Sequence, residues 1–187
     1  MALNSSFFIN CVRLLSGGLL ATFLAGAFAA GEDDTAPPPP TPTSQCPDGQ
    51  IYDKKTKKCQ PANHTGFNDK DRYLALRELA YAGRYRSAEL VLQSISNNSS
   101  SEVLAYVGFL HRKQGRYTEA LNSYMLALDK NPNNILVRSY LGQGFVEQKR
   151  LDLAELQLNE IRQRNGSGTW AEESLSLAIK TGLTSSY

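Results

Sequence analysis

The residues of this sequence that could do chemistry are two histidines, three cysteines and a few carboxylates. His64 lies in a polar connector, and His111 lies in a run of helical character. Neither has a partner of the right type at a matching spacing, as general base catalysis requires. Glu147 likewise lacks a second carboxylate on its face of the helix. We therefore expect His111 to be a packed side chain rather than a general base.

Motifs with a known catalytic mechanism are also missing from the sequence. It holds no phosphate-cradling glycine loop, no zinc-protease motif and no nucleophile elbow. Two cysteines and one histidine do not complete a structural zinc site. The sequence therefore predicts no enzyme, no cofactor and no metal.

The first 29 residues have the plan of a secretory signal peptide. Arg13 is the only charge before Glu32, an apolar run follows from Leu14, and residues 27–29 form a small-x-small site. We expect cleavage after Ala29 or Ala30 and a periplasmic or secreted protein. The alternative is an uncleaved membrane anchor, although residues 14–30 are only marginally long enough to span a bilayer. Contact with a membrane is expected only in that case.

The cysteines that remain after cleavage predict a disulfide. Cys46 and Cys59 form an even pair in an exported chain, which is typical of disulfide bonding. Between them, residues 47–49 are a turn signal and "QIYD" is a short β-like run. Residues 46–59 are therefore predicted to form a small hairpin closed by a disulfide. Its basic run (Lys54, Lys55, Lys57 and Lys58) is either a solvated turn or a site for an anionic ligand.

The composition and net charge of the whole chain are those of an ordinary globular protein. The 187 residues are 41% hydrophobic, 20% charged and carry a net charge of +2, which gives no support for a nucleic-acid partner. Residues 30–45 contain four consecutive prolines and predict an extended, semi-rigid linker.

From about residue 69 onward the sequence repeats itself. The segment "YAGRYRSAELVLQSI" (81–95) aligns with "KQGRYTEALNSYMLAL" (113–128) and with "EQKRLDLAELQLNEI" (147–161). Gly83, Gly115 and Lys149 share one position in this alignment, with spacings of 32 and 34 residues. A fixed period of this size is typical of a solenoid made of helical repeats.

Each repeat is predicted to be a pair of antiparallel helices. Small residues such as Gly108 let the two helix backbones approach closely, and Gly115 breaks the chain between the helices because glycine accepts positive φ. Pro132 ends the second helix. The glycines and the proline in this helical stretch therefore mark close packing, a turn and a stop.

Residues 106–132 resemble the tetratricopeptide repeat (TPR). This resemblance implies an all-α fold, a short superhelix of about three repeats at residues 69–100, 101–134 and 135–168, with a capping helix at 169–181. Thr169 is predicted to cap that last helix, with Glu172 three residues on. Lys149 departs from the pattern, because it stands where the third repeat should carry its turn glycine. The overall layout is also similar to small exported bacterial TPR proteins. The repeat positions that match are Gly83, Tyr85, Ala88, Gly108, Gly115, Tyr117, Ala120, Tyr124, Ala127, Pro132, Gly142 and Ala154.

The resemblance also implies a function, since the first helices of TPR arrays line a concave groove that binds a partner protein or peptide. The predicted groove residues are Tyr73, Arg77, Ala105, Phe109, Arg112, Lys113, Ser139 and Gln143. Phe109 is either a peptide anchor or a side chain packed against a neighbouring helix. The Lys and Asn pattern with which some TPRs grip a carboxyl terminus is absent here. We thus expect an exported adaptor without catalytic activity; the alternative is a membrane-tethered structural subunit with an uncleaved anchor.

Overall fold

The computed structural model describes residue 36 and residues 42–184. The predicted signal peptide (1–29) and most of the predicted linker (30–45) lie outside the described residues. The described part is helical except for one hairpin, which confirms the all-α repeat fold. Its elements in chain order are the 3-10 helix η2 (Pro42–Gln45), the strands β1 (Gln50–Asp53) and β2 (Lys58–Pro61), and the helices α1 (Asp69–Tyr81), α2 (Tyr85–Leu92), α3 (Ser101–Lys113), α4 (Tyr117–Lys130), α5 (Ile135–Glu147), α6 (Leu151–Gln163) and α7 (Trp170–Thr181).

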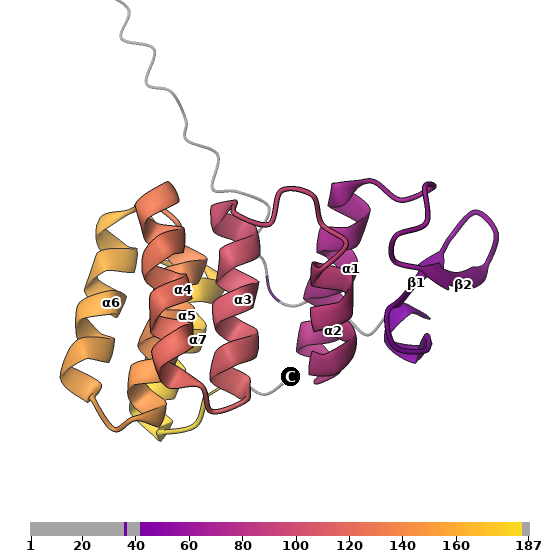
Figure 1. Ribbon diagram of the computed structural model, residues 1–187. Coiled ribbons are helices and arrows are strands. Elements are labelled where there is room, and N and C mark those ends of the chain that lie inside the picture. Colours follow the sequence, from indigo (N-terminus) through magenta and orange to yellow (C-terminus); the bar gives the residue numbers. More distant parts are fainter. Residues whose placement is uncertain (1–35, 37–41, 185–187) are drawn as a thin grey trace, which may run out of the picture.

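The helices pack as consecutive pairs. α1 contacts α2, α3 contacts α4 and α5 contacts α6, while the first helices α1, α3 and α5 also contact one another in chain order. The pairs follow one another across the molecule, from the hairpin at one end to α6 at the other (Figure 1). α7 packs on α5 and α6 as α5 packs on α3 and α4, so it caps the open end of the last pair, as predicted.

The three turns inside the helix pairs share one conformation, although one of them lacks glycine. Gly83, Gly115 and Lys149 have φ of 70°, 75° and 61°, which is the left-handed region. The second helix of each pair begins two residues later. In each turn, the N–H of the arginine that follows donates to the carbonyl five residues earlier, and these pairs are Arg84 to Leu79, Arg116 to His111 and Arg150 to Phe145. The alignment of Lys149 with two glycines therefore reflects an equivalent backbone, which Lys149 adopts at a steric cost.

Polar side chains begin the first helix of each pair and the capping helix. Asn68, Ser100 and Asn134 accept a hydrogen bond from a backbone N–H three residues on, at α1, α3 and α5. Thr169 does the same for α7, as predicted, and accepts from the N–H of Glu172 at 3.4 Å. The Glu172 carboxylate accepts from the N–H of Gly168 at 2.9 Å. These caps satisfy backbone donors that would otherwise lie unpaired at the helix ends.

Two glycines allow close packing between helices. A Cβ at Gly108 would lie 2.4 Å from Cε1 of Tyr124, and a Cβ at Gly142 would lie 2.6 Å from Cδ2 of Leu175. Gly108 therefore makes room for a ring of its own repeat, whereas Gly142 makes room for the capping helix.

The hairpin caps the other end of the helical array. Cys46 and Cys59 form the predicted disulfide, and β1 pairs with β2 in antiparallel register. Ile51 is buried in the same hydrophobic core as the helices, and the N–H of Gly49 donates to Oγ of Ser87 on α2 at 3.3 Å. The base of the hairpin is thus part of the folded unit.

Adding one methyl group at Gly108 is expected to destabilise the protein. Gly108→Ala should lower the free energy of unfolding, because an overpacking cost of about 1–3 kcal/mol outweighs the gain of roughly 1 kcal/mol for alanine in a helix. Denaturant unfolding measures this effect. Gly144→Ala is the control, since its Cβ would lie 3.2 Å from Cδ of Arg112, a milder clash than the one at Gly108, and should cost less. Equal stability of the two variants would contradict the tight contact at Gly108.

Candidate functional site

We call the side of α1, α3 and α5 that carries the predicted groove residues the inner face. Arg77, Ala105, Phe109, Arg112, Ser139 and Gln143 are buried, whereas Tyr73 and Lys113 are partly exposed. The structure thus brings the eight residues onto adjoining helices but covers six of them. The partner-binding role of the set stays a prediction.

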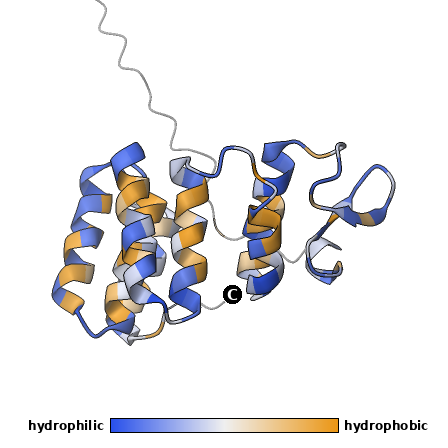
Figure 2. Cartoon of the chain, in the orientation of Figure 1, coloured by the Kyte–Doolittle hydropathy of each residue, from blue (hydrophilic) through white to orange (hydrophobic). Residues whose placement is uncertain are grey.

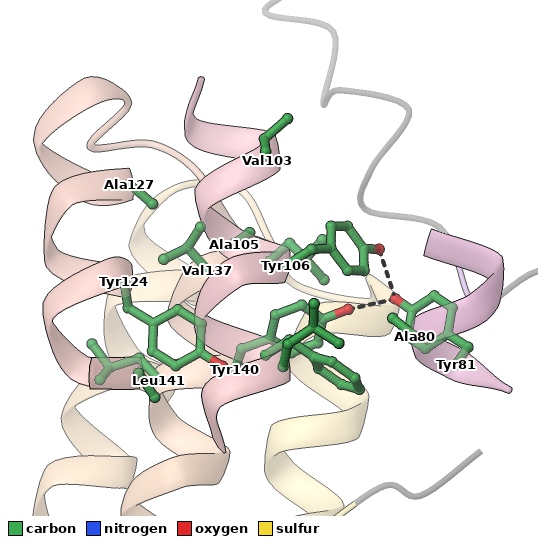
Figure 3. Packing of buried hydrophobic residues seen from close by; sticks show 14 of the residues in the cluster. Ala80, Tyr81, Val103, Ala105, Tyr106, Tyr124, Ala127, Val137, Tyr140 and Leu141 are labelled. Carbon is green, nitrogen blue, oxygen red and sulfur yellow. Dashed lines mark hydrogen bonds between the residues drawn. The ribbon is translucent and has the colours of Figure 1, made fainter. Parts of the chain in front are cut away.

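Three tyrosine hydroxyls meet beneath the inner face. The hydroxyl of Tyr106 on α3 donates to that of Tyr81 on α1 at 3.1 Å, and the hydroxyls of Tyr81 and Tyr140 also share a hydrogen bond. Figure 3 shows these hydroxyls converging from the three first helices. All three residues are buried. Each first helix is therefore joined to the others by a polar contact as well as by apolar packing.

Aromatic rings surround these hydroxyls. Phe109, 1% exposed, has its ring centroid 5.2 Å from that of Tyr140 and 5.9 Å from that of Tyr81. Trp170 at the start of α7 lies 6.3 Å from Tyr140 and 6.5 Å from Tyr81. These distances are within the range of favourable edge-to-face contacts. Phe109 thus packs against the protein's own helices, and α7 reaches across to α1.

Burial shifts the acidity of these tyrosines. It raises the pKa of Tyr106 and of Tyr140 well above the ordinary value of 10.0, because the ionised phenolate would be poorly solvated. It also raises the pKa of Tyr124 to about 12. Tyr106 and Tyr140 are therefore neutral at physiological pH.

Arg112 and Glu147 form an ion pair at one end of the inner face. Nη1 of Arg112 donates to Oε1 of Glu147 at 2.6 Å, and the arginine is only 2% exposed. The guanidinium also lies over the ring of Phe109, 5.4 Å from its centroid. The side chain passes next to Gly144, where a Cβ would crowd it. It lines a cavity between α3, α4 and α5 of about 10 Å³, which has room for about one water molecule.

Lys113 is the partly exposed charged group of the predicted set. Its Nζ lies 5.6 Å from the ring centroid of Phe109. Burial, together with the neighbouring positive charge of Arg112, lowers the pKa of Lys113 to about 8. Lys113 is therefore mostly charged at neutral pH and loses its charge in mildly alkaline solution.

Segments from outside the repeats also contact the inner face. Nη2 of Arg77 donates to the backbone carbonyl of Ala36 at 3.2 Å, across 41 residues of chain. At the opposite end, the hydroxyl of Thr184 donates to the Glu147 carboxylate. Side chains of the inner face thus hold backbone and hydroxyl groups of the chain's own N-terminal and C-terminal segments.

The capping helix covers the inner-face positions of the third pair. The hydroxyls of Ser139 and Ser174 lie 3.0 Å apart, and Nε2 of Gln143 donates to Oγ of Ser139 at 3.3 Å. All three are buried. Ser139 and Gln143 therefore contact α7.

The two histidines belong to no group of metal ligands among the described residues. His64 Nδ1 accepts from the N–H of Gly66 at 3.1 Å. His111 is partly buried, and its pKa is lowered by burial and by Arg116. Within residues 42–184, no three His, Cys, Asp or Glu side chains are grouped as metal ligands. The same part of the chain has no helix of the length and apolar character needed to cross a bilayer.

Comparison with known proteins agrees with this architecture. A family model for the tetratricopeptide repeat matches residues 101–134, which comprise α3, α4 and the turn that follows. The chain contains a tetratricopeptide repeat. Searches of curated proteins and of solved structures gave no match. TPRs generally mediate protein–protein interactions, and an all-helical TPR fold is typically a non-catalytic scaffold.

The sequence did not predict several residues that build this TPR face. Tyr81, Tyr140, Glu147 and Trp170 supply hydroxyls, a carboxylate and a ring from three helices. One signal was available, because Tyr106 and Tyr140 are 34 residues apart and occupy equivalent positions of successive first helices. The contacts of Trp170 and Glu147 have no such period, so no sequence pattern predicts them.

Removing one hydroxyl should weaken the tyrosine cluster. Tyr140→Phe leaves the Tyr81 hydroxyl with one partner fewer, and we expect it to lower the free energy of unfolding by about 1–2 kcal/mol. Tyr117→Phe is the control, since that side chain is exposed and the substitution should cost almost nothing.

The wild-type protein should also lose stability as the pH rises above about 10, because tyrosines then ionise in the unfolded chain but stay protonated in the fold.

Urea unfolding at neutral and alkaline pH measures both effects. Above pH 10, Tyr140→Phe should show a shallower loss of stability than the wild type, because one tyrosine with a raised pKa is gone. A stability independent of pH in that range would contradict the burial of the hydroxyls.

Proposed function

We propose that this protein is an exported TPR adaptor that binds an extended segment of a partner protein along its inner face. The observation that carries the proposal is the contact of Arg77 with the Ala36 carbonyl. It is a side chain at a predicted groove position that holds the backbone of a segment from outside the repeats. A partner's backbone offers the same carbonyl acceptors.

The accessible parts of the inner face have the chemistry of a peptide site. Tyr73 presents an aromatic ring, which packs edge-to-face on Tyr106 with centroids 5.7 Å apart, and Lys113 presents an amine. Aromatic side chains are enriched among the residues that dominate binding energy. The buried Phe109 and Arg112 support the surface from beneath, so a partner would be recognised by Tyr73 and Lys113.

The same contacts imply that a partner competes with the chain's own segments. Ala36 contacts Arg77, and Thr184 contacts Glu147, near the two ends of the row of inner-face residues. A binding segment would displace one or both of them. Such competition lowers the apparent affinity for any partner that does not replace these hydrogen bonds.

Selection from a displayed peptide library, followed by affinity measurements in solution, tests the proposal. Peptides selected on the chain without residues 1–29 should bind the Tyr73→Ala, Lys113→Glu double variant at least about tenfold more weakly, because an aromatic contact and a charge contact are lost. The control is Met125→Ala, Lys130→Glu on the exposed side of α4, which makes a similar change elsewhere and should leave affinity unchanged. Selected peptides that bind both variants equally would place the site off the inner face.

Export is tested separately at the N-terminus. The mass of the protein recovered from the producing cell should correspond to a start at Ala30 or Gly31, because a signal peptidase cleaves after a small-x-small site. Retention of residues 1–29 in a membrane fraction would instead support the tethered subunit with an uncleaved anchor.

A further inference from the structure

Four lysines cluster at the tip of the disulfide hairpin. Lys54, Lys55 and Lys57 lie in the turn between β1 and β2, Lys58 is the first residue of β2, and all four are exposed. The whole chain carries a net charge of +2, so without these four lysines it would carry −2. Figure 2 shows the hairpin turn as strongly hydrophilic, and it projects from the end of the molecule away from the helices.

The base of the hairpin holds this tip in place. Residues 46 and 59 are joined by the disulfide, and Ile51 on β1 is buried in the core. Nη1 of Arg84 donates to the carbonyls of Ser44 and Cys46 at 2.6 and 3.0 Å. The base of the hairpin is therefore held against the helices, and the lysines lie at the opposite end of the hairpin.

Nearby carboxylates do not fully neutralise the tip. Asp53 lies opposite Lys58 and interacts electrostatically with Lys55, which leaves residues 53–58 with a net charge of +3. Asp48 pairs with Arg84 at 2.6 Å at the base of the hairpin. The oxygens of Asp53 accept from the hydroxyl of Thr56 and from the N–H of Lys55, both at 2.8 Å, and these bonds lower the pKa of Asp53. Among the ion pairs of the described residues, none involves a lysine of the tip. The four ammonium groups are thus available to an external anion.

The composition of the tip indicates the kind of anion. Residues 53–58 read "DKKTKK", with no aromatic, arginine or large apolar side chain. Protein interfaces are anchored by such side chains and are depleted in lysine, and nucleic-acid sites use aromatic rings to stack bases. Lysines without an anchor suit a surface on which negative charge is spread out, such as a bilayer with anionic lipids.

We propose that the hairpin tip binds the surface of an anionic lipid bilayer. Each lysine near such a surface raises the affinity about fivefold, so a group of four is enough for measurable, salt-sensitive binding. The contact would hold the folded unit against a membrane while leaving the inner face open to a partner. It does not depend on the fate of residues 1–29 or on groove binding.

Co-sedimentation with lipid vesicles tests the proposal, using the chain without residues 1–29 so that only the folded unit is measured. It should bind vesicles of phosphatidylcholine mixed with phosphatidylglycerol and not those of phosphatidylcholine alone. Replacing Lys54, Lys55, Lys57 and Lys58 with Gln should lower the partition coefficient at least about tenfold. Inorganic phosphate should release the protein no better than sodium chloride at equal ionic strength, because the site is a surface and not a phosphate pocket.

The matched control removes the same number of positive charges from the helical part of the chain instead of the hairpin tip. Lys70, Lys130, Lys149 and Lys180 are exposed and spread over the helical repeats, and replacing them with Gln should change partitioning by less than about twofold. The proposal is overturned if wild-type protein does not bind anionic vesicles, if it binds both kinds equally, or if the two quadruple variants lose binding to the same degree. Circular dichroism and an intact disulfide confirm that both variants fold.

Discussion

The hydrogen bonds among Tyr81, Tyr106 and Tyr140 join the three first helices at one point. Their hydroxyls lie in an aromatic interior, where an unpaired polar group is costly, so each helix must arrive at the position that satisfies the others. Helix pairs in a solenoid otherwise contact only their neighbours. Here the contact of Tyr81 with Trp170 links the first helix directly to the last one. The array is therefore closed on its inner side by its own rings.

This closure decides what the inner face offers to a partner. Phe109 and Arg112 lie beneath the surface, while Tyr73 and Lys113 stay accessible. Arg77 donates to the carbonyl of Ala36, and Glu147 accepts from the hydroxyl of Thr184. Six of the eight predicted groove residues are thus buried, and their binding role stays a prediction.

The two ends of the array are finished in different ways. At the C-terminal end, α7 covers the third pair by placing Leu175 against Gly142. At the N-terminal end, the hairpin places Ile51 into the core and is held by a disulfide and by Arg84. A short array exposes much of its surface at its ends, so such caps contribute a large share of its burial. The cap at the hairpin end also carries four exposed lysines.

The sequence by itself determined the helix pairs, their turns and the disulfide. These depend on local physics, namely the helical period, the left-handed turn at Gly83, Gly115 and Lys149, and the proximity of Cys46 to Cys59 in the chain. Only the tertiary structure decided which side chains are accessible. The burial of Phe109 depends on rings from α1, α2 and α5. The contacts of Arg77 and Glu147 span 41 and 37 residues. Such contacts depend on how elements distant in the chain pack together, which no single repeat encodes.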